Sequence, residues 1–397
     1  PSKQPHPKNE QKPLRLRSTS HDCPFQDSTS NLFFTRSTAP TPMSSSSFPA
    51  STLHRAIHIV IAVIFVVSIS FLDHVNGLDA GQTVIDSPLL TQKIGTNSTI
   101  IKVDINGDGD FKSVQAAIDS VPEDNSQWVI IHLEKGVYRE KVHVPKSKPY
   151  IFLRGNGKER SAIVWAQSSS NNVESATFKV EAPHFIAFGI TFKNEAPIGV
   201  AYTPQNQSVA AFVAADNVAF YHCGFYSTHN TLFDYKGRHY YGNCYIQGSV
   251  DLIFGSGRSL FHSCEIFVIG DRRVEIQGSV TAQIRESASE NTGFVFVKGK
   301  VYGVGGGGVY LGRAKGAYSR VVFAQTYLSR TIVPQGWTNW SYDGTTENLY
   351  HAEYKCQGPG ADSTQRSSWS KQLSEKEVTP FISIDYIDGQ KWLPVWL

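Results

Sequence analysis

Short apolar runs separated by turn-forming residues dominate the chain from about residue 128 onward. The clearest runs are residues 128–133, 150–153, 176–180 and 185–192, and the pattern continues to about residue 332. Gly, Asn, Asp and Pro stand between them, which is typical of strands joined by tight turns. One helix is expected ahead of the strands, over residues 111–121, because positions 114, 117, 118 and 121 are apolar. The pattern therefore predicts a mostly β protein with a short helix near its start.

A repeat of about twenty residues organises the middle of this region. The segments Phe220-Tyr-His-Cys-Gly-Phe225, Tyr241-Gly-Asn-Cys-Tyr-Ile246 and Phe261-His-Ser-Cys-Glu-Ile266 align, and their cysteines fall at positions 223, 244 and 264. A repeat of this length, built from short strands without helices, is typical of a β-solenoid. Like residues then stack on successive coils, about 4.8 Å apart. Cys223, Cys244 and Cys264 are therefore expected to form an internal stack within one parallel sheet.

The part of the chain before residue 78 differs in composition from the rest. Residues 1–42 are rich in Ser, Pro and Thr, and Met43 is the only methionine, so we interpret them as an upstream or disordered leader. Residues 43–77 resemble a secretory signal peptide, with an apolar run at 56–72 followed by small residues. A membrane anchor is the alternative, because a span needs about 17–25 residues. Residues 78–397 are expected to form a single domain.

Charge and cysteine content exclude several classes of partner. Residues 1–77 hold seven of the 37 Lys and Arg and four of the 34 Asp and Glu, so the rest of the chain carries equal numbers of basic and acidic side chains. A neutral domain argues against a nucleic-acid partner, which selects basic surfaces. No CxxC pair accompanies the cysteines, so neither a zinc site nor a thioredoxin-like motif is indicated. No metal or organic cofactor is expected.

Three polar side chains recur at nearly the interval of the repeat. They are Gln207, Asn230 and Asp251. We therefore expect them on successive coils and on the same face. Such a column would hold an acyl group between a carboxylate nucleophile and amide hydrogen-bond donors.

The sequence around these positions resembles the plant pectin methylesterases, or pectinesterases, in the form without an N-terminal inhibitor-like domain. The resemblance covers about residues 101–397. It rests on motifs that occur in order: Gly136-Val-Tyr-Arg-Glu140, Gln207-Ser-Val-Ala-Ala211, Gly248-Ser-Val-Asp-Leu-Ile-Phe-Gly255, Leu311-Gly-Arg313, Pro334-Gln-Gly-Trp337 with Trp340, Tyr350-His-Ala-Glu-Tyr354 and Gly358-Pro-Gly-Ala361.

This resemblance implies a right-handed parallel β-helix with a groove for homogalacturonan. It also implies a secreted enzyme of the plant cell wall that hydrolyses pectin methyl esters to free carboxylates and methanol. Asp251 would be the nucleophile, Gln207 the oxyanion donor and Arg313 the group that orients the carboxylate. Trp337, Trp340 and Lys315 would contact the sugar, although both tryptophans could instead belong to the core. A proteinaceous pectinesterase inhibitor is a further implied partner, and we expect a monomer.

Two positions depart from the family pattern. Where the family usually has Gln-Asp-Thr-Leu, this chain has His229-Asn230-Thr231-Leu232. The family's Asp is the general acid/base, whereas Asn230 carries no titratable proton. His229 could replace it, since imidazole titrates near ~6.5, or it could have a structural or substrate-contact role. Lys315 stands where the family commonly has Trp.

Two alternative functions are a pectin-binding pseudoenzyme and a different β-helical pectin enzyme, either a glycosidase or a lyase, and the residues argue against the second. Loss of the acid/base favours a pseudoenzyme that binds pectin without hydrolysing it. A glycosidase would need two carboxylates flanking the bond, and the column offers only Asp251. A lyase would need a calcium-binding cluster of acids, which residues 248–255 lack. Asn97, Asn206 and Asn339 begin glycosylation sequons, which fit a secreted glycoprotein.

Overall fold

The computed structural model describes residues 85–95, 98–197, 207–270, 276–304, 308–339 and 344–397. The predicted leader, signal peptide and Trp340 lie outside these residues. The segment Asp79–Leu397 is one compact unit. Among the described residues, no helix combines the length and the apolar character that a membrane span requires.

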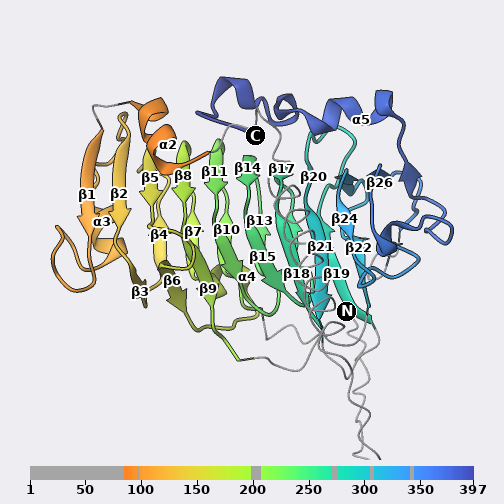
Figure 1. Ribbon diagram of the computed structural model, residues 1–397, viewed down its shortest axis with the longest axis horizontal. Helices are drawn as coiled ribbons and strands as arrows, with labels where there is room; N and C mark the ends of the chain where they lie inside the picture. Colours follow the sequence, from red (N-terminus) through yellow and green to blue (C-terminus); the bar gives the residue numbers. More distant parts are fainter. Residues whose placement is uncertain (1–84, 96–97, 198–206, 271–275, 305–307, 340–343) are drawn as a thin grey trace, which may run out of the picture. The chain divides into compact units, whose positions relative to one another are not determined.

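A coil of three short strands repeats through this unit, and each strand pairs in parallel with its counterpart in the next coil (Figure 1). Sheet A consists, among the described residues, of β1 (Thr99–Val103), β2 (Val129–Leu133), β5 (Ile151–Arg154), β8 (Phe185–Phe188), β11 (Val218–Tyr221), β14 (Arg238–Gly242), β17 (Arg258–His262), β20 (Gly293–Val297), β23 (Arg320–Ala324), β26 (Tyr350–Tyr354) and β27 (Lys371–Gln372). Sheet B consists of β3 (Gly136–Tyr138), β6 (Ser161–Trp165), β9 (Thr191–Asn194), β12 (Gly224–Tyr226), β15 (Tyr245–Gly248), β18 (Glu265–Ile269), β21 (Lys300–Val304) and β24 (Tyr327–Leu328). Sheet C consists of β4 (Val142–Val144), β7 (Phe178–Val180), β10 (Ala211–Val213), β13 (Leu232–Asp234), β16 (Ile253–Gly255), β19 (Ile276–Gln283), β22 (Gly308–Ala314) and β25 (Trp337–Thr338). The predicted β-solenoid is confirmed.

A single left-handed residue turns the chain from sheet A to sheet B in successive coils. These residues are Gly189, His222, Asn243, Ser263, Lys298, Gln325 and Lys355, with φ between 46° and 63°. The run predicted over 185–192 is therefore two strands, β8 and β9, bent at Gly189. Its apolar pattern continues around the corner because both strands face the same interior.

The helices lie outside the coil. They are α2 (Ser87–Ile94), α3 (Val114–Ser120), α4 (Asn172–Ser175) and α5 (Glu375–Ile382), with the 3₁₀ turns η2 (Pro359–Ala361), η3 (Ile384–Ile387) and η4 (Gly389–Lys391). The predicted helix is confirmed as α3, capped by the Ser113 hydroxyl, which accepts from the Ala116 N–H. Val114, Ala117 and Ile118 of this helix are buried against the core. The pattern did not predict α2, α4 or α5. Figure 1 shows α5 and the following turns along sheet A, and these elements contact β17, β20 and β23.

Stacked side chains fill the interior. The rings of Tyr241, Phe261, Phe296 and Phe323 follow one another at centroid distances of 4.4, 4.6 and 4.4 Å and lie nearly parallel. The predicted cysteine stack lies beside them, since Cys223, Cys244 and Cys264 are buried free thiols in register on three coils. They occupy the corner between sheets A and B rather than a strand. Burial raises the pKa of the Cys223 and Cys244 thiols, so both behave as small apolar side chains.

Candidate active site

Two side chains of the predicted column occupy the same position on neighbouring coils of sheet C. Leu232 of β13 pairs with Ile253 of β16, which places Asn230 in register with Asp251. Both precede their strands in the left-handed conformation, with φ of 56° and 47°. Asn and Asp adopt that region more readily than other side chains that carry a Cβ. Asn and Asp therefore suit these two positions both for their left-handed backbone and for their polar side chains.

Gln207 lies two positions away from the predicted register. Ala211 pairs with Leu232, so the register partner of Asn230 is Val209 rather than Gln207. The interval from Gln207 to Asn230 exceeds the length of this coil by two positions. The predicted column of three is therefore wrong for Gln207, and only Asn230 and Asp251 are in register. The Gln207 carbonyl accepts from the Ser169 N–H at 3.0 Å. Its side-chain Oε1 is buried without a hydrogen-bond partner among the described residues.

Asp251 is buried and held by Arg313. The Arg313 Nε donates to Oδ1 at 2.8 Å and Nη2 donates to Oδ2 at 2.5 Å, which is the bidentate geometry of strong guanidinium–carboxylate pairs. Arg313 reaches the carboxylate from β22, where its strand neighbour on β19 is the small Ala282. Burial alone would lower the pKa of Arg313, but the hydrogen bonds and charge of Asp251 raise it above its ordinary value. The pair is therefore an oriented carboxylate beside a permanent cation.

Ser279 is a contact that the sequence did not reveal. It lies on β19 in register with Asp251, is fully buried, and donates from Oγ to Asp251 Oδ1 at 2.8 Å. The interval between Asp251 and Ser279 is longer than the repeat that the cysteines define, so a search at that spacing passes over this serine.

The altered pair His229-Asn230 lies beside these groups. The Asn230 Nδ2 donates to Oδ1 of Asn172 in α4 at 2.9 Å, so a second amide holds this side chain. His229 forms a parallel bridge with Val250, the residue before Asp251, and it is 7% exposed. His229 and Asp251 thus belong to adjacent coils at the same corner.

The predicted sugar contacts have different surroundings. Lys315 is exposed just after β22, and its Nζ lies 5.7 Å from the centre of the Phe254 ring. Reduced solvation lowers its pKa, while the nearby Asp251 acts in the opposite direction. Trp337 is only 1% exposed, and its indole N–H donates to Glu353 at 3.1 Å. The Trp337 ring therefore belongs to the core, which was the alternative to a sugar contact in the sequence analysis.

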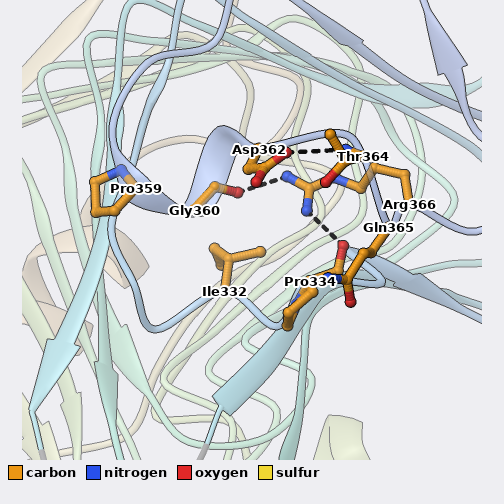
Figure 2. Close-up of a pocket in the computed structure, with 8 residues that line it drawn as sticks. All are labelled: Ile332, Pro334, Pro359, Gly360, Asp362, Thr364, Gln365 and Arg366. Atoms are coloured by element: carbon orange, nitrogen blue, oxygen red, sulfur yellow. Dashed lines mark hydrogen bonds between the residues drawn. The ribbon is translucent and has the colours of Figure 1, made fainter.

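A small pocket is lined by residues other than these, and Arg366 is one of them (Figure 2). It measures about 110 Å³. The Arg366 guanidinium donates to the Pro334 and Gly360 carbonyls and to both oxygens of Glu353. Little donor capacity is left for a ligand, and no predicted site residue lines the pocket. Within the described ranges, no cluster of three or more His, Cys, Asp or Glu side chains could hold a metal ion.

Comparisons with known proteins agree with this arrangement. The model of the pectinesterase family matches residues 100–390. "Probable pectinesterase 67" of Arabidopsis thaliana is 62% identical over 87% of this chain and 98% of its own length, and "Putative pectinesterase 11" of the same plant is 43% identical over 75% and 82%. A solved pectin methylesterase from carrot matches with a TM-score of 0.71 and 32% identity, covering 75% of this chain and 96% of its own. This likeness confirms the right-handed parallel β-helix. The chain belongs to the pectinesterase family.

Proposed function

We propose that this chain hydrolyses the methyl esters of homogalacturonan, with Asp251 as its nucleophile. The observation that carries the proposal is the buried carboxylate held by two hydrogen bonds from Arg313, in a chain of the pectinesterase family. The guanidinium holds the carboxylate in one orientation through both hydrogen bonds, as a covalent nucleophile requires.

The reaction proceeds in two steps. An oxygen of Asp251 attacks the ester carbonyl carbon, and the carbon–methoxy bond breaks as methanol leaves with a proton. Water then cleaves the acyl-enzyme anhydride, which frees the galacturonate carboxylate and regenerates Asp251. The Gln207 amide is suited to donate a hydrogen bond from Nε2 to the substrate's developing oxyanion.

Asp251→Asn tests the nucleophile. Methanol release from methylated pectin should disappear in the full chain, while binding to immobilised pectin persists, because the groove and not the bond-forming oxygen retains the polymer. Asp216→Asn is a matched control, since Asp216 forms a partly exposed ion pair with Arg238. Retained methanol release by Asp251→Asn would refute the assignment.

We assign the proton transfer to His229, because Asn230 cannot perform it. His229 directly precedes Asn230, at the corner that carries Asp251. Positioned acid–base catalysis contributes about 10²–10⁴ in rate. His229→Gln should therefore lower kcat within that range and remove a limb of the pH profile, and adding Asn230→Asp should restore turnover.

A pectin-binding pseudoenzyme is the second candidate, and Asn230 is the observation that favours it. In that case wild-type methanol release should be nearly absent, while Asn230→Asp alone should raise it. An active wild type that is indifferent to His229→Gln would contradict both accounts.

Lys315 is proposed to bind a free galacturonate carboxylate next to the reacting ester. Lys315 is an exposed residue beside the site, and Asp251 lies near enough to act on its ammonium. Lys315→Ala should raise KM for partly demethylated pectin more than for fully methylated pectin. Trp340 is retained as a proposed sugar contact, and Trp337 is not, because its ring is buried.

Secretion to the plant cell wall follows from the proposed substrate and the signal-like segment 43–77. N-terminal sequencing of the wall protein tests it, with a start near Leu78 expected. A pectinesterase inhibitor as partner and a monomeric state remain part of the proposal, and the masses of the free protein and of its mixture with an inhibitor test both.

A further inference from the structure

The two oxygens of Asp251 have unequal hydrogen-bonding. Oδ1 accepts from both Ser279 Oγ and Arg313 Nε, each at 2.8 Å, whereas Oδ2 accepts from Arg313 Nη2 alone. A carboxylate oxygen offers about two acceptor sites in its plane. Oδ1 is therefore saturated, and Oδ2 retains one site that no described residue occupies.

We propose that Ser279 is a positioning residue that reserves Oδ2 of Asp251 as the attacking oxygen. The free electron pair on Oδ2 forms the bond to the ester carbonyl carbon, and the carbonyl π electrons move to the substrate oxygen. Collapse of this intermediate breaks the carbon–methoxy bond, and the leaving oxygen takes a proton from His229, the proposed acid/base, to form methanol. Ser279 keeps its proton throughout and acts only through Asp251, so this inference rests on the proposed nucleophile.

The strand register explains why this hydroxyl is fixed. Ser279 lies on the coil next to Asp251, between Gly278 and Val280, and its side chain has no exposed surface. Without its hydroxyl, Oδ1 would lose one of two donors and the two oxygens would become alike. The carboxylate could then turn about its Cβ–Cγ bond more freely against Arg313, and fewer orientations would present a free electron pair to the ester.

Thr281 provides a matched control on the same strand. It is also fully buried, but its hydroxyl donates to the Leu311 carbonyl at 2.9 Å rather than to the site. Thr281→Val therefore removes a nearby buried hydroxyl from the same strand without altering the hydrogen bonds of Asp251.

The test compares kcat and KM for Ser279→Ala, Ser279→Thr, Ser279→Cys and Thr281→Val in the full chain. Ser279→Ala should lower kcat about ten- to hundredfold with KM within about twofold, the range expected for losing a hydrogen bond to a charged group. Ser279→Thr should recover most of the rate, and Ser279→Cys should fall between because a thiol is a weaker donor.

A structural role predicts a different result. If Ser279→Ala and Thr281→Val lose the same stability and the same fraction of kcat, or if Thr does not rescue, the positioning role is overturned. Should Ser279→Ala fail to fold, the kcat values of the wild type, Ser279→Thr and Ser279→Cys still decide the question, because the positioning role requires the Cys variant to be slower than the other two. An active Asp251→Asn would instead refute the nucleophile itself, so the two failures are distinguishable.

Discussion

Removing the Arg313 guanidinium should affect the site more than any other single truncation around Asp251. Arg313→Ala deletes both of its hydrogen bonds to the carboxylate and leaves Ser279 as the only described donor. Both partners are buried, at 8% and 6% exposure. Breaking a buried pair by removing one partner costs about 3–5 kcal/mol, because the remaining charge is uncompensated.

The same loss should appear in catalysis. If the full amount is lost from the transition state, kcat/KM falls by about 10²–10⁴. Arg313→Lys keeps the charge but cannot form two parallel hydrogen bonds, so it should recover only part of the rate. Initial rates of methanol release at several pectin concentrations measure these effects, and urea denaturation measures stability on the same preparations.

Arg285→Ala is the control for truncating a buried arginine. Arg285 is 6% exposed, and its guanidinium donates to the carbonyls of Ala288, Glu290 and Tyr318 rather than to a carboxylate. It should lose stability with little change in kcat. An Arg313→Ala variant with kcat within about threefold of Arg285→Ala would show that the ion pair is structural only.

Three further predictions concern the coil itself. The two ring nitrogens of buried His239 face Asp234 and the Ala215 carbonyl, and although burial opposes protonation, these groups raise the pKa of His239. The contribution of His239 to stability should therefore be complete below the ordinary histidine pKa and should fall as pH rises through the raised value. Urea unfolding at several pH values should show this dependence, and His239→Gln should remove it. Phe261→Ala should lower the free energy of unfolding by about 3–5 kcal/mol, because it opens a gap in the ring stack. Trp337→Phe should lower it by about 1–3 kcal/mol through the lost indole hydrogen bond, and a raised KM without loss of stability would instead indicate sugar contact.

Periodicity predicted the features that repeat at constant length. The recurrence of the cysteines identified the coil, and the same interval placed Asn230 against Asp251 correctly. Both succeeded because parallel pairing in register requires coils of equal length. The helical spacing at 114–121 similarly identified α3.

The failures occurred where coil length changes or where burial overrides residue type. Gln207 lies two positions away from the register that its spacing predicted. The repeat did not predict Ser279, because the chain between β18 and β19 is longer than the link between β15 and β16 in the preceding coil. Trp337 was compatible with either sugar or core, and only its contacts with Glu353 and the His351 ring distinguish them. The sequence did not predict the left-handed corners between sheets A and B, because six residue types, Gly, His, Asn, Ser, Lys and Gln, occupy them.

Asn230 has opposite consequences for the two halves of the proposed reaction. An aspartate there would place a second carboxylate one strand spacing, about 4.8 Å, from Asp251, and two like charges at that distance disfavour joint ionisation. Asn230 removes this repulsion, retains the left-handed corner and is held by Asn172. The first, covalent step therefore keeps its carboxylate nucleophile, the orienting cation Arg313 and the Ser279 hydroxyl. The proton transfers that release methanol and activate water lose their carboxyl group. Rate limitation should consequently move from bond formation by Asp251 to the proton transfers assigned to His229.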